Sequence, residues 1–354
     1  MKNYLIICLI AALLVGCKKD DKPEFDRKAM LTNMASTVIQ PAYTGMAADL
    51  AALHTSATNF TANPTVTALN TLKSDFIEAY KTWQHCKMFD FGPMMDYGIK
   101  ASMNTYPTDT VQIQNNVSTG VYTLTALENV DAIGFPAIDF LLYYQGETAV
   151  INSFTTDPNA TNRKTYLTDV TAKMKSEFDL VVSGWSSYES SFIASDGNDA
   201  GSSTSLLFNE FVKDIELLKN AKIGIPAGQQ TGGMPLPDYV EAYYSGISTS
   251  LAIESIIGLK NVFNGATGSG FDDYIKDVEG EDVTVSLADN INTQFDVCKS
   301  AVNTIGNPLS DKVTTANTTV NNAYLEIKKL VTYCKTDMSS TLGLLITFQD
   351  NDGD

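Results

Sequence analysis

The chain has 354 residues, of which 24 are lysine or arginine and 41 are aspartate or glutamate, giving a formal net charge of −17. A hydrophobic content of 44% beside 18% charged residues is ordinary for a globular protein and excludes an intrinsically disordered chain. So strong a negative charge repels phosphate backbones and argues against nucleic acid as a partner. The length suggests two domains.

The first residues have the pattern of a secretory signal peptide. Lys2 supplies the positive charge, and an almost uninterrupted apolar run follows from Tyr4 to Val15. That run is too short to span a bilayer, which needs about 20 apolar residues, but it suits the core of a signal peptide. Gly16 stands directly before Cys17, and small residues before a cysteine are the pattern that lipoprotein signal peptidase reads. We therefore predict that residues 1–16 are removed.

The residues after the predicted cleavage site indicate a lipid anchor. Cys17 would carry the lipid, and residues 17–26 would form the acylated tether, in which Lys18 to Asp21 are polar. Several acyl chains hold a protein far more firmly than one, since each buried methylene contributes about 0.8 kcal/mol. The sequence thus predicts a lipoprotein of the outer membrane, on its periplasmic or cell-surface side. The alternative is an ordinary signal peptide in which Cys17 is incidental.

Helical periodicity runs through nearly all of the remaining chain, and alternating strand patterns are scarce. In chain order, apolar residues at three- and four-residue spacing predict helices over residues 27–55, 69–83, 120–144, 167–185, 208–218, 236–263, 285–305 and 327–334. The second of these follows Pro64-Thr65, and Ser203 to Ser205 offer N-caps for the fifth. Each apolar stripe covers only part of its helix, as in helices that bury one side in a bundle.

The clearest break between helices is at residues 194–205, which lack a large apolar residue and are rich in Gly, Ser, Asp and Asn. Similar numbers of helical segments precede and follow it. We predict an all-α protein of two antiparallel helical bundles packed against each other. The N-terminal bundle would span residues 27–196 and the C-terminal bundle residues 203–354.

Few side chains are suited to metal or nucleophile chemistry. The two histidines, His54 and His85, belong to no HExxH or serine-hydrolase motif, and we interpret both as capping or surface groups. Beyond the predicted anchor, the cysteines are Cys86, Cys298 and Cys334, and they form no CxxC pair. The predicted compartment permits disulfides, and Cys298 with Cys334 is the more plausible pair.

One apolar segment contains a carboxylate that needs an explanation. Asp139 lies in the run from Glu128 to Tyr143, and Pro136 stands three residues before it. Proline is tolerated in the first turn of a helix, where unpaired N–H groups and the helix dipole stabilise a carboxylate. The structural interpretation of Asp139 is therefore a first-turn carboxylate that stabilises its own helix.

Several motifs together resemble the imelysin-like family. Gly134 to Asp139, followed by Phe140-Leu141-Leu142, is similar to the family's Gly-x-His-x-x-Glu signature and to the apolar run after it. Further similar segments keep the family's order and cover most of the chain: Trp83 with Phe91-Gly92-Pro93, Asn209-Glu210 with Lys222 to Gly228, Val240 to Ser248, and Leu342 to Phe348 with the acidic end at 350–354.

The resemblance implies two helical bundles, a periplasmic or surface location and a link to iron uptake. Some members are described as insulin-cleaving peptidases, and the signature His and Glu are the proposed metal or catalytic groups, near the domain interface. Matched position by position, Gly134 is kept, the histidine is Pro136 and the glutamate is Asp139. Proline has no metal-binding or proton-accepting side chain, and Asp139 reaches one methylene less far than glutamate. The resemblance thus implies the family's scaffold without its signature chemistry.

These observations predict a membrane-anchored protein of iron uptake that binds a ligand or partner at the cleft between the bundles and lacks peptidase activity. The alternatives are a diverged metallopeptidase of the imelysin family and a structural accessory of an outer-membrane complex. The expected partners are an outer-membrane iron transporter or a small iron-containing ligand. The cofactor stays unknown: iron or another divalent metal is one option, but the sequence offers too few ligands to support it.

The acidic end at 350–354 lacks the bidentate glutamate of a calcium loop and is interpreted as a solvated tail. We expect the cleft to be lined by Trp83, Phe91, Asp139, Tyr143, Glu241, Tyr244 and Ser245.

Overall fold

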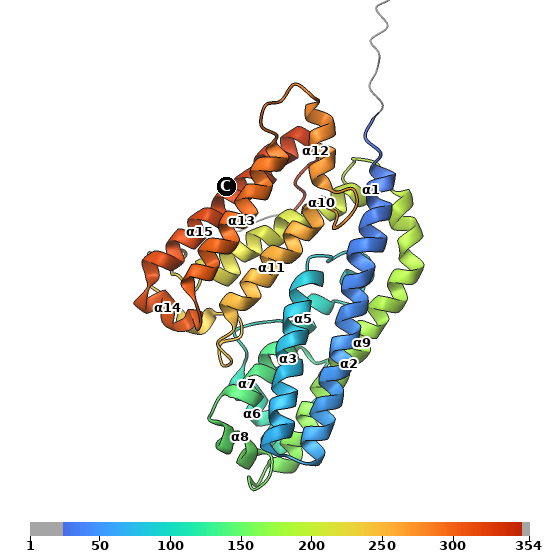
Figure 1. The fold of residues 1–354 in the computed structure, drawn as a ribbon. Coiled ribbons are helices and arrows are strands. Elements are labelled where there is room, and N and C mark those ends of the chain that lie inside the picture. The colour runs from blue at the N-terminus through green and yellow to red at the C-terminus, as the bar shows by residue number, and fades with distance from the viewer. Residues whose placement is uncertain (1–23, 349–354) are drawn as a thin grey trace, which may run out of the picture.

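The computed structural model describes residues 24–348, and this part of the chain is built from helices without a β-strand (Figure 1). The predicted signal peptide, Cys17 and the acidic end at 350–354 lie outside the described residues. None of the helices within residues 24–348 combines the length and the apolar character that a bilayer crossing needs.

The helices form two bundles, as predicted. The first bundle contains α1 (Arg27–Asn33), α2 (Gln40–Ala62), α3 (Val66–Cys86), α4 (Pro93–Asp96), α5 (Ile99–Met103), α6 (Thr110–Thr119), α7 (Gly134–Tyr143), α8 (Glu147–Ser153) and α9 (Ala160–Ala194). The second contains α10 (Ser203–Leu217), α11 (Ser248–Phe263), α12 (Phe271–Glu279), α13 (Leu287–Ile305), α14 (Leu309–Thr315), α15 (Asn317–Val331) and α16 (Ser339–Leu342). Short π-helical segments lie at Met34–Ile39, Leu218–Gly224 and Thr332–Met338, and 3-10 turns at Leu127–Asn129 and Pro237–Tyr239.

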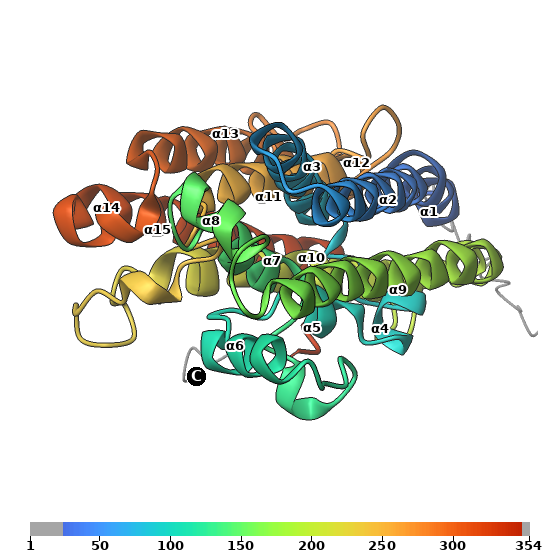
Figure 2. The same cartoon turned by 90° about the horizontal axis from the view of Figure 1, so that it is seen from below.

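The first bundle is organised by three long helices, α2, α3 and α9 (Figures 1 and 2). Thr65 caps α3 as the sequence predicts, because its side chain accepts a hydrogen bond from the Ala68 N–H at 3.2 Å. The apolar stripe of α9 packs on α2: the rings of Phe178 and Trp185 meet Tyr43 edge-on, with centroids 5.9 and 5.7 Å apart. Figure 2 shows α4, α5 and α6 on the opposite side of α9 from α2 and α3.

The second bundle is built around α10, α11, α13 and α15. At its centre the rings of Phe211, Phe263 and Phe295, from three different helices, lie with centroids 5.9–6.4 Å apart. The helix predicted over 208–218 begins earlier than expected, because Ser202 rather than a later serine provides its N-cap, accepting from the Ser205 N–H at 3.3 Å. The apolar residues whose spacing predicted this helix, from Phe208 to Leu218, are buried in the structure.

The two bundles meet mainly where α3 of the first lies against α11 of the second. Gly258 of α11 permits this approach, because a Cβ atom added there would lie 3.1 Å from the Cα atom of His85. At the other end of the boundary, the Asn33 side chain donates to the carbonyl groups of Gly265 and Ser269 at 2.8 and 2.9 Å. The buried apolar residues form one continuous core that runs through both bundles.

Two of the predicted helices are much shorter in the structure. Of the helix expected over 120–144, only α7 from Gly134 onward forms, because Gly134 itself has a positive φ of 72°, which does not allow a right-handed helix to continue through it. Of the helix expected over 236–263, only α11 from Ser248 onward forms. Before it, Ala242 and Gly246 have positive φ values of 52° and 72°, which a right-handed helix does not allow. Only some of the apolar residues in these two segments are buried, such as Ile133 and Val240, whereas Val121 and Leu127 are exposed.

The three cysteines of the described region are free and buried. The predicted disulfide between Cys298 and Cys334 is therefore wrong. Burial raises the pKa of the Cys298 thiol to about 12, which keeps it protonated. Its sulfur lies 3.8 Å from the Nε2 atom of Gln294, which donates to it. These thiols act as small apolar groups of the core.

The start of α7 depends on a glycine for a steric reason. Gly134 has φ of 72°, and a Cβ atom there would lie 2.3 Å from the carbonyl oxygen of Met103. Gly98 has a similar φ of 62°, but nothing lies within 4 Å of its missing Cβ. We expect Gly98→Ala to lower the free energy of unfolding by only about 1–2 kcal/mol, the backbone contribution, and Gly134→Ala to lower it clearly more because of the clash. Urea unfolding followed by circular dichroism measures both; equal losses would contradict this account.

Candidate functional site

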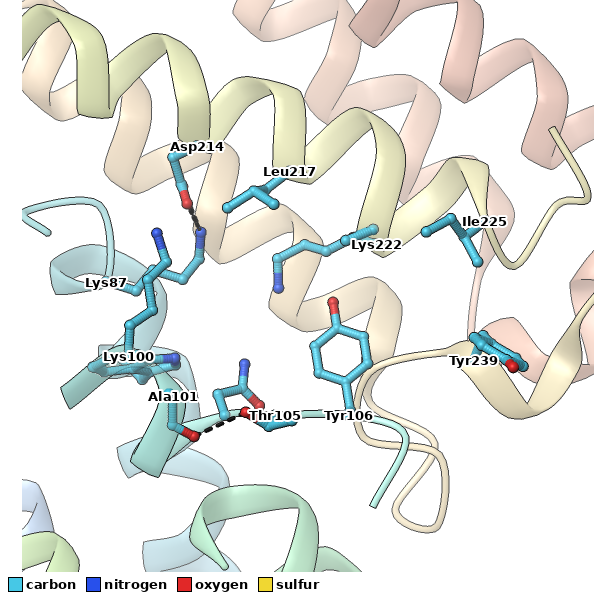
Figure 3. A pocket seen from close by; sticks show the side chains of 13 residues that line it. Lys87, Lys100, Ala101, Thr105, Tyr106, Asp214, Leu217, Lys222, Ile225 and Tyr239 are labelled. Carbon is cyan, nitrogen blue, oxygen red and sulfur yellow. Dashed lines mark hydrogen bonds and ion pairs between the residues drawn. The ribbon is translucent and has the colours of Figure 1, made fainter. Parts of the chain in front are cut away.

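Two neighbouring cavities lie along the boundary between the bundles. The first, which we call the signature cavity, has a volume of about 340 Å³ and is lined by Tyr106, Pro107, Thr108, Thr110, Pro136, Asp139, Asp238, Val240, Ala242, Tyr243 and Tyr244. The second, the lysine cavity (Figure 3), has a volume of about 470 Å³ and is lined by Trp83, Lys87, Lys100, Ala101, Asn104, Thr105, Tyr106, Asp214, Leu217, Ala221, Lys222, Ile225 and Tyr239. Tyr106 lines both cavities, so that they lie side by side.

Asp139 connects the two bundles. It is the sixth residue of α7 and is only 1% exposed, and its two carboxylate oxygens accept hydrogen bonds from the backbone N–H groups of Tyr244 (2.8 Å) and Ser245 (3.0 Å). The interpretation of Asp139 as a first-turn carboxylate of its own helix is therefore wrong. The carboxylate instead fixes residues 240–247, the loop before α11, against α7.

The surroundings of Asp139 favour its protonated form. Burial raises the pKa of Asp139 from its ordinary value of 3.8 to about 6, although the hydrogen bonds from Ser245 and Tyr244 act in the opposite direction. The negative charge of Glu241 raises the pKa further. The carboxylate thus titrates in a range in which an exposed aspartate is already fully charged.

Glu241 is the centre of a second connection across the boundary. It is 1% exposed, and its Oε2 atom pairs with the ammonium of Lys222. Its Oε1 atom accepts from Gln84 Nε2 at 3.1 Å and from Asn104 Nδ2 at 2.7 Å, both in the first bundle. Lys222 belongs to the π-helical segment Leu218–Gly224, and such segments are frequent at functional sites. A buried carboxylate is thus satisfied by both bundles at once.

A second buried ion pair lies at the other end of the lysine cavity. The Lys87 ammonium contacts both carboxylate oxygens of Asp214, which is fully buried on α10. Burial alone would raise the pKa of Asp214, but Lys87 and Lys100 outweigh it and hold that pKa below its ordinary value. Burial lowers the pKa of Lys87, while the charge of Asp214 opposes that change.

Two polar groups at this cavity have no hydrogen-bond partner. One is the Nζ atom of Lys100, whose nearest ion-pair contact is Asp90 Oδ2 at 3.8 Å, and the other is the indole Nε1 atom of Trp83, which is 1% exposed. Figure 3 shows Lys100 beside Lys87 at one end of the cavity, with Tyr239 at the other end. The cavity is therefore cationic at one end and apolar or aromatic at the other.

The structure places the sequence-predicted site residues in three ways. Trp83 lines the lysine cavity, while Pro136, Asp139 and Tyr244 line the signature cavity. Glu241 bonds to residues that line the lysine cavity, and Ser245 holds Asp139 through its backbone N–H.

Phe91 and Tyr143 line neither cavity, contrary to expectation. Phe91 is buried in the core of the first bundle, stacked on Phe192 with centroids 5.5 Å apart. The ring of Tyr143 packs near Phe76, with the Lys73 ammonium 4.6 Å from its centroid. Both are ordinary packing positions, and aromatic residues near a motif do not reveal by themselves whether they face a core or a cavity.

Sequence reasoning missed most of the charged residues of the lysine cavity. Asp214 falls on the apolar stripe of its helix, three residues after Phe211 and four before Leu218, which was a readable signal of a buried charge. Lys222 stood in a quoted motif but carried no predicted role. Lys87 and Lys100 gave no signal, because nothing in the sequence says that these two lysines line one cavity.

Comparison with known proteins identifies the family. The family model described as imelysin (peptidase family M75) matches residues 39–332. The chain belongs to the imelysin family. A solved structure described as an iron-regulated protein A precursor from Parabacteroides distasonis ATCC 8503 is 20% identical, with a TM-score of 0.76 over 92% of this chain and 97% of that one. An imelysin-like protein from Psychrobacter arcticum 273-4 is 17% identical, with a TM-score of 0.73 over 91% and 97%. No curated protein matches.

The comparisons confirm the predicted family and the all-α fold. At these identities the two solved structures share the fold with this chain, and they say nothing further about its site. The family is described as a peptidase family, and a peptidase of this kind would hold a metal ion at the signature position. Whether the side chains there can bind a metal depends on their donor atoms.

The signature position of this imelysin-family chain does not have the donors of a metal centre. Pro136, which the sequence resemblance matches to the signature histidine, has no ligand atom in its side chain. Both oxygens of Asp139 accept backbone hydrogen bonds. Across residues 24–348, no three or more His, Cys, Asp and Glu side chains are grouped so that they could hold a metal ion. The described residues therefore do not fit the metal that a peptidase of this family would use.

The raised pKa of Asp139 predicts a pH-dependent stability. Between pH about 4 and about 6 the folded protein retains a proton that the unfolded chain has lost, so the unfolded chain binds fewer protons and stability falls as pH rises. Relative to Asp139→Asn, the free energy of unfolding of the native protein should fall by up to about 3 kcal/mol across this window and stay level above it, at about 1.4 kcal/mol per pKa unit. Urea titrations of both proteins from pH 4 to 8 measure this difference, in which other carboxylates cancel. A difference independent of pH would contradict it.

Proposed function

We propose that this imelysin-family protein is a membrane-anchored binding protein of iron uptake, which takes a ligand or partner at the boundary between its bundles and does not cleave peptides. The observation that carries the proposal is that the carboxylate of Asp139 is occupied by hydrogen bonds to the other bundle. Asp139 holds the backbone of Tyr244 and Ser245, and its neighbour Pro136 replaces the only histidine of the signature.

The absence of peptidase chemistry follows from what a hydrolytic site requires. A metallopeptidase needs an open coordination position and a base that can reach a water molecule. Asp139 has a pKa near 6 and lines a cavity, which favours a diverged peptidase as the second candidate. However, both of its oxygens are engaged by N–H groups, so it acts as a structural connection between bundles rather than as a free base.

The binding function is supported by the cavities themselves. Their volumes of about 340 and 470 Å³ lie in the range of small-molecule sites, and both open at a boundary between bundles, where ligand sites are frequent. The ion pair between Lys222 and Glu241 preorganises the boundary without a ligand. The iron context is supported by the fold that the chain shares with the protein described as iron-regulated protein A.

The binding proposal is tested with tag-free protein, which is dialysed against ferric iron, haem or a ferric siderophore and then examined by elemental analysis and absorbance. We expect saturable binding of at least one of the three and no cleavage of casein. The proposal fails if none binds while casein is cleaved, the cleavage is abolished by a chelator, and Asp139→Asn removes it. Asp96→Asn, which changes an exposed carboxylate on α4, is the control for the loss of one negative charge.

The membrane anchor is tested separately, since Cys17 lies outside the described residues. We expect the full chain, expressed in a bacterium with its own lipoprotein pathway, to enter the detergent phase on Triton X-114 partition. Cys17→Ser should move it to the aqueous phase, because no acyl chain can be attached. Cys298→Ser, at a buried thiol, is the control and should stay in the detergent phase. If Cys17→Ser partitions like the native protein, Cys17 is not the anchor.

A further inference from the structure

We propose that the lysine cavity binds a small organic carboxylate with an apolar or aromatic body, whose head group is held by the Lys100 ammonium and the Trp83 indole N–H. This proposal rests on the proposed binding function and assigns a chemical class to the ligand. It concerns a cavity distinct from the signature cavity, although the two share Tyr106.

Lys100 provides a buried ammonium that makes no hydrogen bond. The other two lysines of the cavity each have a close carboxylate, Lys87 with Asp214 and Lys222 with Glu241. The Nζ atom of Lys100 is shielded from solvent and lies 3.8 Å from the nearest oxygen of Asp90, too far for a hydrogen bond. That oxygen is also 3.6 Å from the Lys213 ammonium, so Asp90 is shared between two cations. Lys100 is thus the lysine of the cavity with the weakest contact to a carboxylate.

Trp83, on α3 of the same bundle as Lys100, supplies a second donor. Its indole N–H is a donor only, it is buried, and it has no acceptor. Buried donors without partners are uncommon and call for an explanation. Two such donors, one charged and one neutral, line the same cavity, and an anion with two acceptor oxygens offers an acceptor to each. Water also accepts hydrogen bonds, but a carboxylate adds a charge-assisted hydrogen bond to the ammonium.

The far end of the cavity selects an organic anion over an inorganic one. Ile225 and Tyr239 lie away from the Lys87 and Lys100 end in Figure 3, with Tyr106 between, whereas Leu217 lies beside Asp214. A ligand with an anionic head and an apolar body would bury that body against these side chains, at about 25 cal/mol for each Å² of apolar surface removed from water. Inorganic phosphate would leave this end filled with water.

Burial makes Lys100 responsive to a bound anion. Burial is the main cause that lowers the pKa of Lys100, while the charges of Asp214 and Asp90 oppose that change. A ligand carboxylate in contact with the ammonium would add a further negative charge that favours its protonated form. Methionine has a similar length and no charge, so Lys100→Met removes the charge and keeps most of the packing.

The experiment measures binding of hexanoate, benzoate and 1-naphthoate, each paired with its uncharged amide, by isothermal titration calorimetry of the full chain without its signal peptide. We expect at least one carboxylate to bind saturably, its amide to bind at least about tenfold more weakly, and Lys100→Met to weaken the carboxylate by at least about tenfold, as for loss of a charge-assisted hydrogen bond. Trp83→Phe should weaken it less, by about threefold to tenfold.

Lys213→Met is the matched control. Lys213 contacts the same Asp90 but pairs with Glu210 at 3.0 Å and does not line the cavity, so its loss should leave the affinity unchanged. Urea unfolding shows that each variant is folded. The proposal is overturned if no carboxylate binds, if an amide binds as well as its acid, if inorganic phosphate binds as tightly, or if Lys100→Met keeps the native affinity. If no carboxylate binds but haem or a siderophore does, only the carboxylate class of the ligand is rejected. If a carboxylate binds but ferric iron, haem and siderophore do not, the iron context of the proposed function is rejected instead.

Discussion

The architecture of the boundary depends on one buried carboxylate, Glu241, which is satisfied from both bundles. Its Lys222 partner lies in a π-helical segment of the second bundle, and its Gln84 and Asn104 partners lie in the first. Removing one partner would leave an uncompensated buried charge, a change that typically costs about 3–5 kcal/mol. The loop that carries Glu241 therefore has a fixed path, and both cavities take their shape from it.

The same loop accounts for the buried carboxylate of α7. With Asp139 bound to the N–H groups of Tyr244 and Ser245, this carboxylate is part of the connection between the bundles. Pro136 is compatible with the first turn of α7. The signature cavity therefore lacks a free carboxylate, whereas the neighbouring lysine cavity has two buried donors without partners.

Charge is distributed unevenly between the surface and the interior of this protein. The chain carries a formal charge of −17, yet the lysine cavity is lined by three lysines and one aspartate. Overall repulsion of anions is screened within about 10 Å in salt, whereas a buried ammonium acts at contact distance in a medium of low dielectric constant. An acidic surface and an anion-binding interior are therefore compatible, and the net charge of a sequence does not reveal the sign of its cavities.

The sequence by itself determined the helices with regular apolar stripes, such as α3 and α9, the all-α fold and the family. These features are local, since periodicity, capping and motif order need no knowledge of distant residues. Only the tertiary structure decided that residues 236–247 form a loop, that Asp139 bonds to another bundle, and that Lys87, Lys100 and Lys222 meet at one cavity. The reason is physical: a long-range ion pair outweighs the weak helical propensity of a short segment, and which charges meet is set by how helices pack.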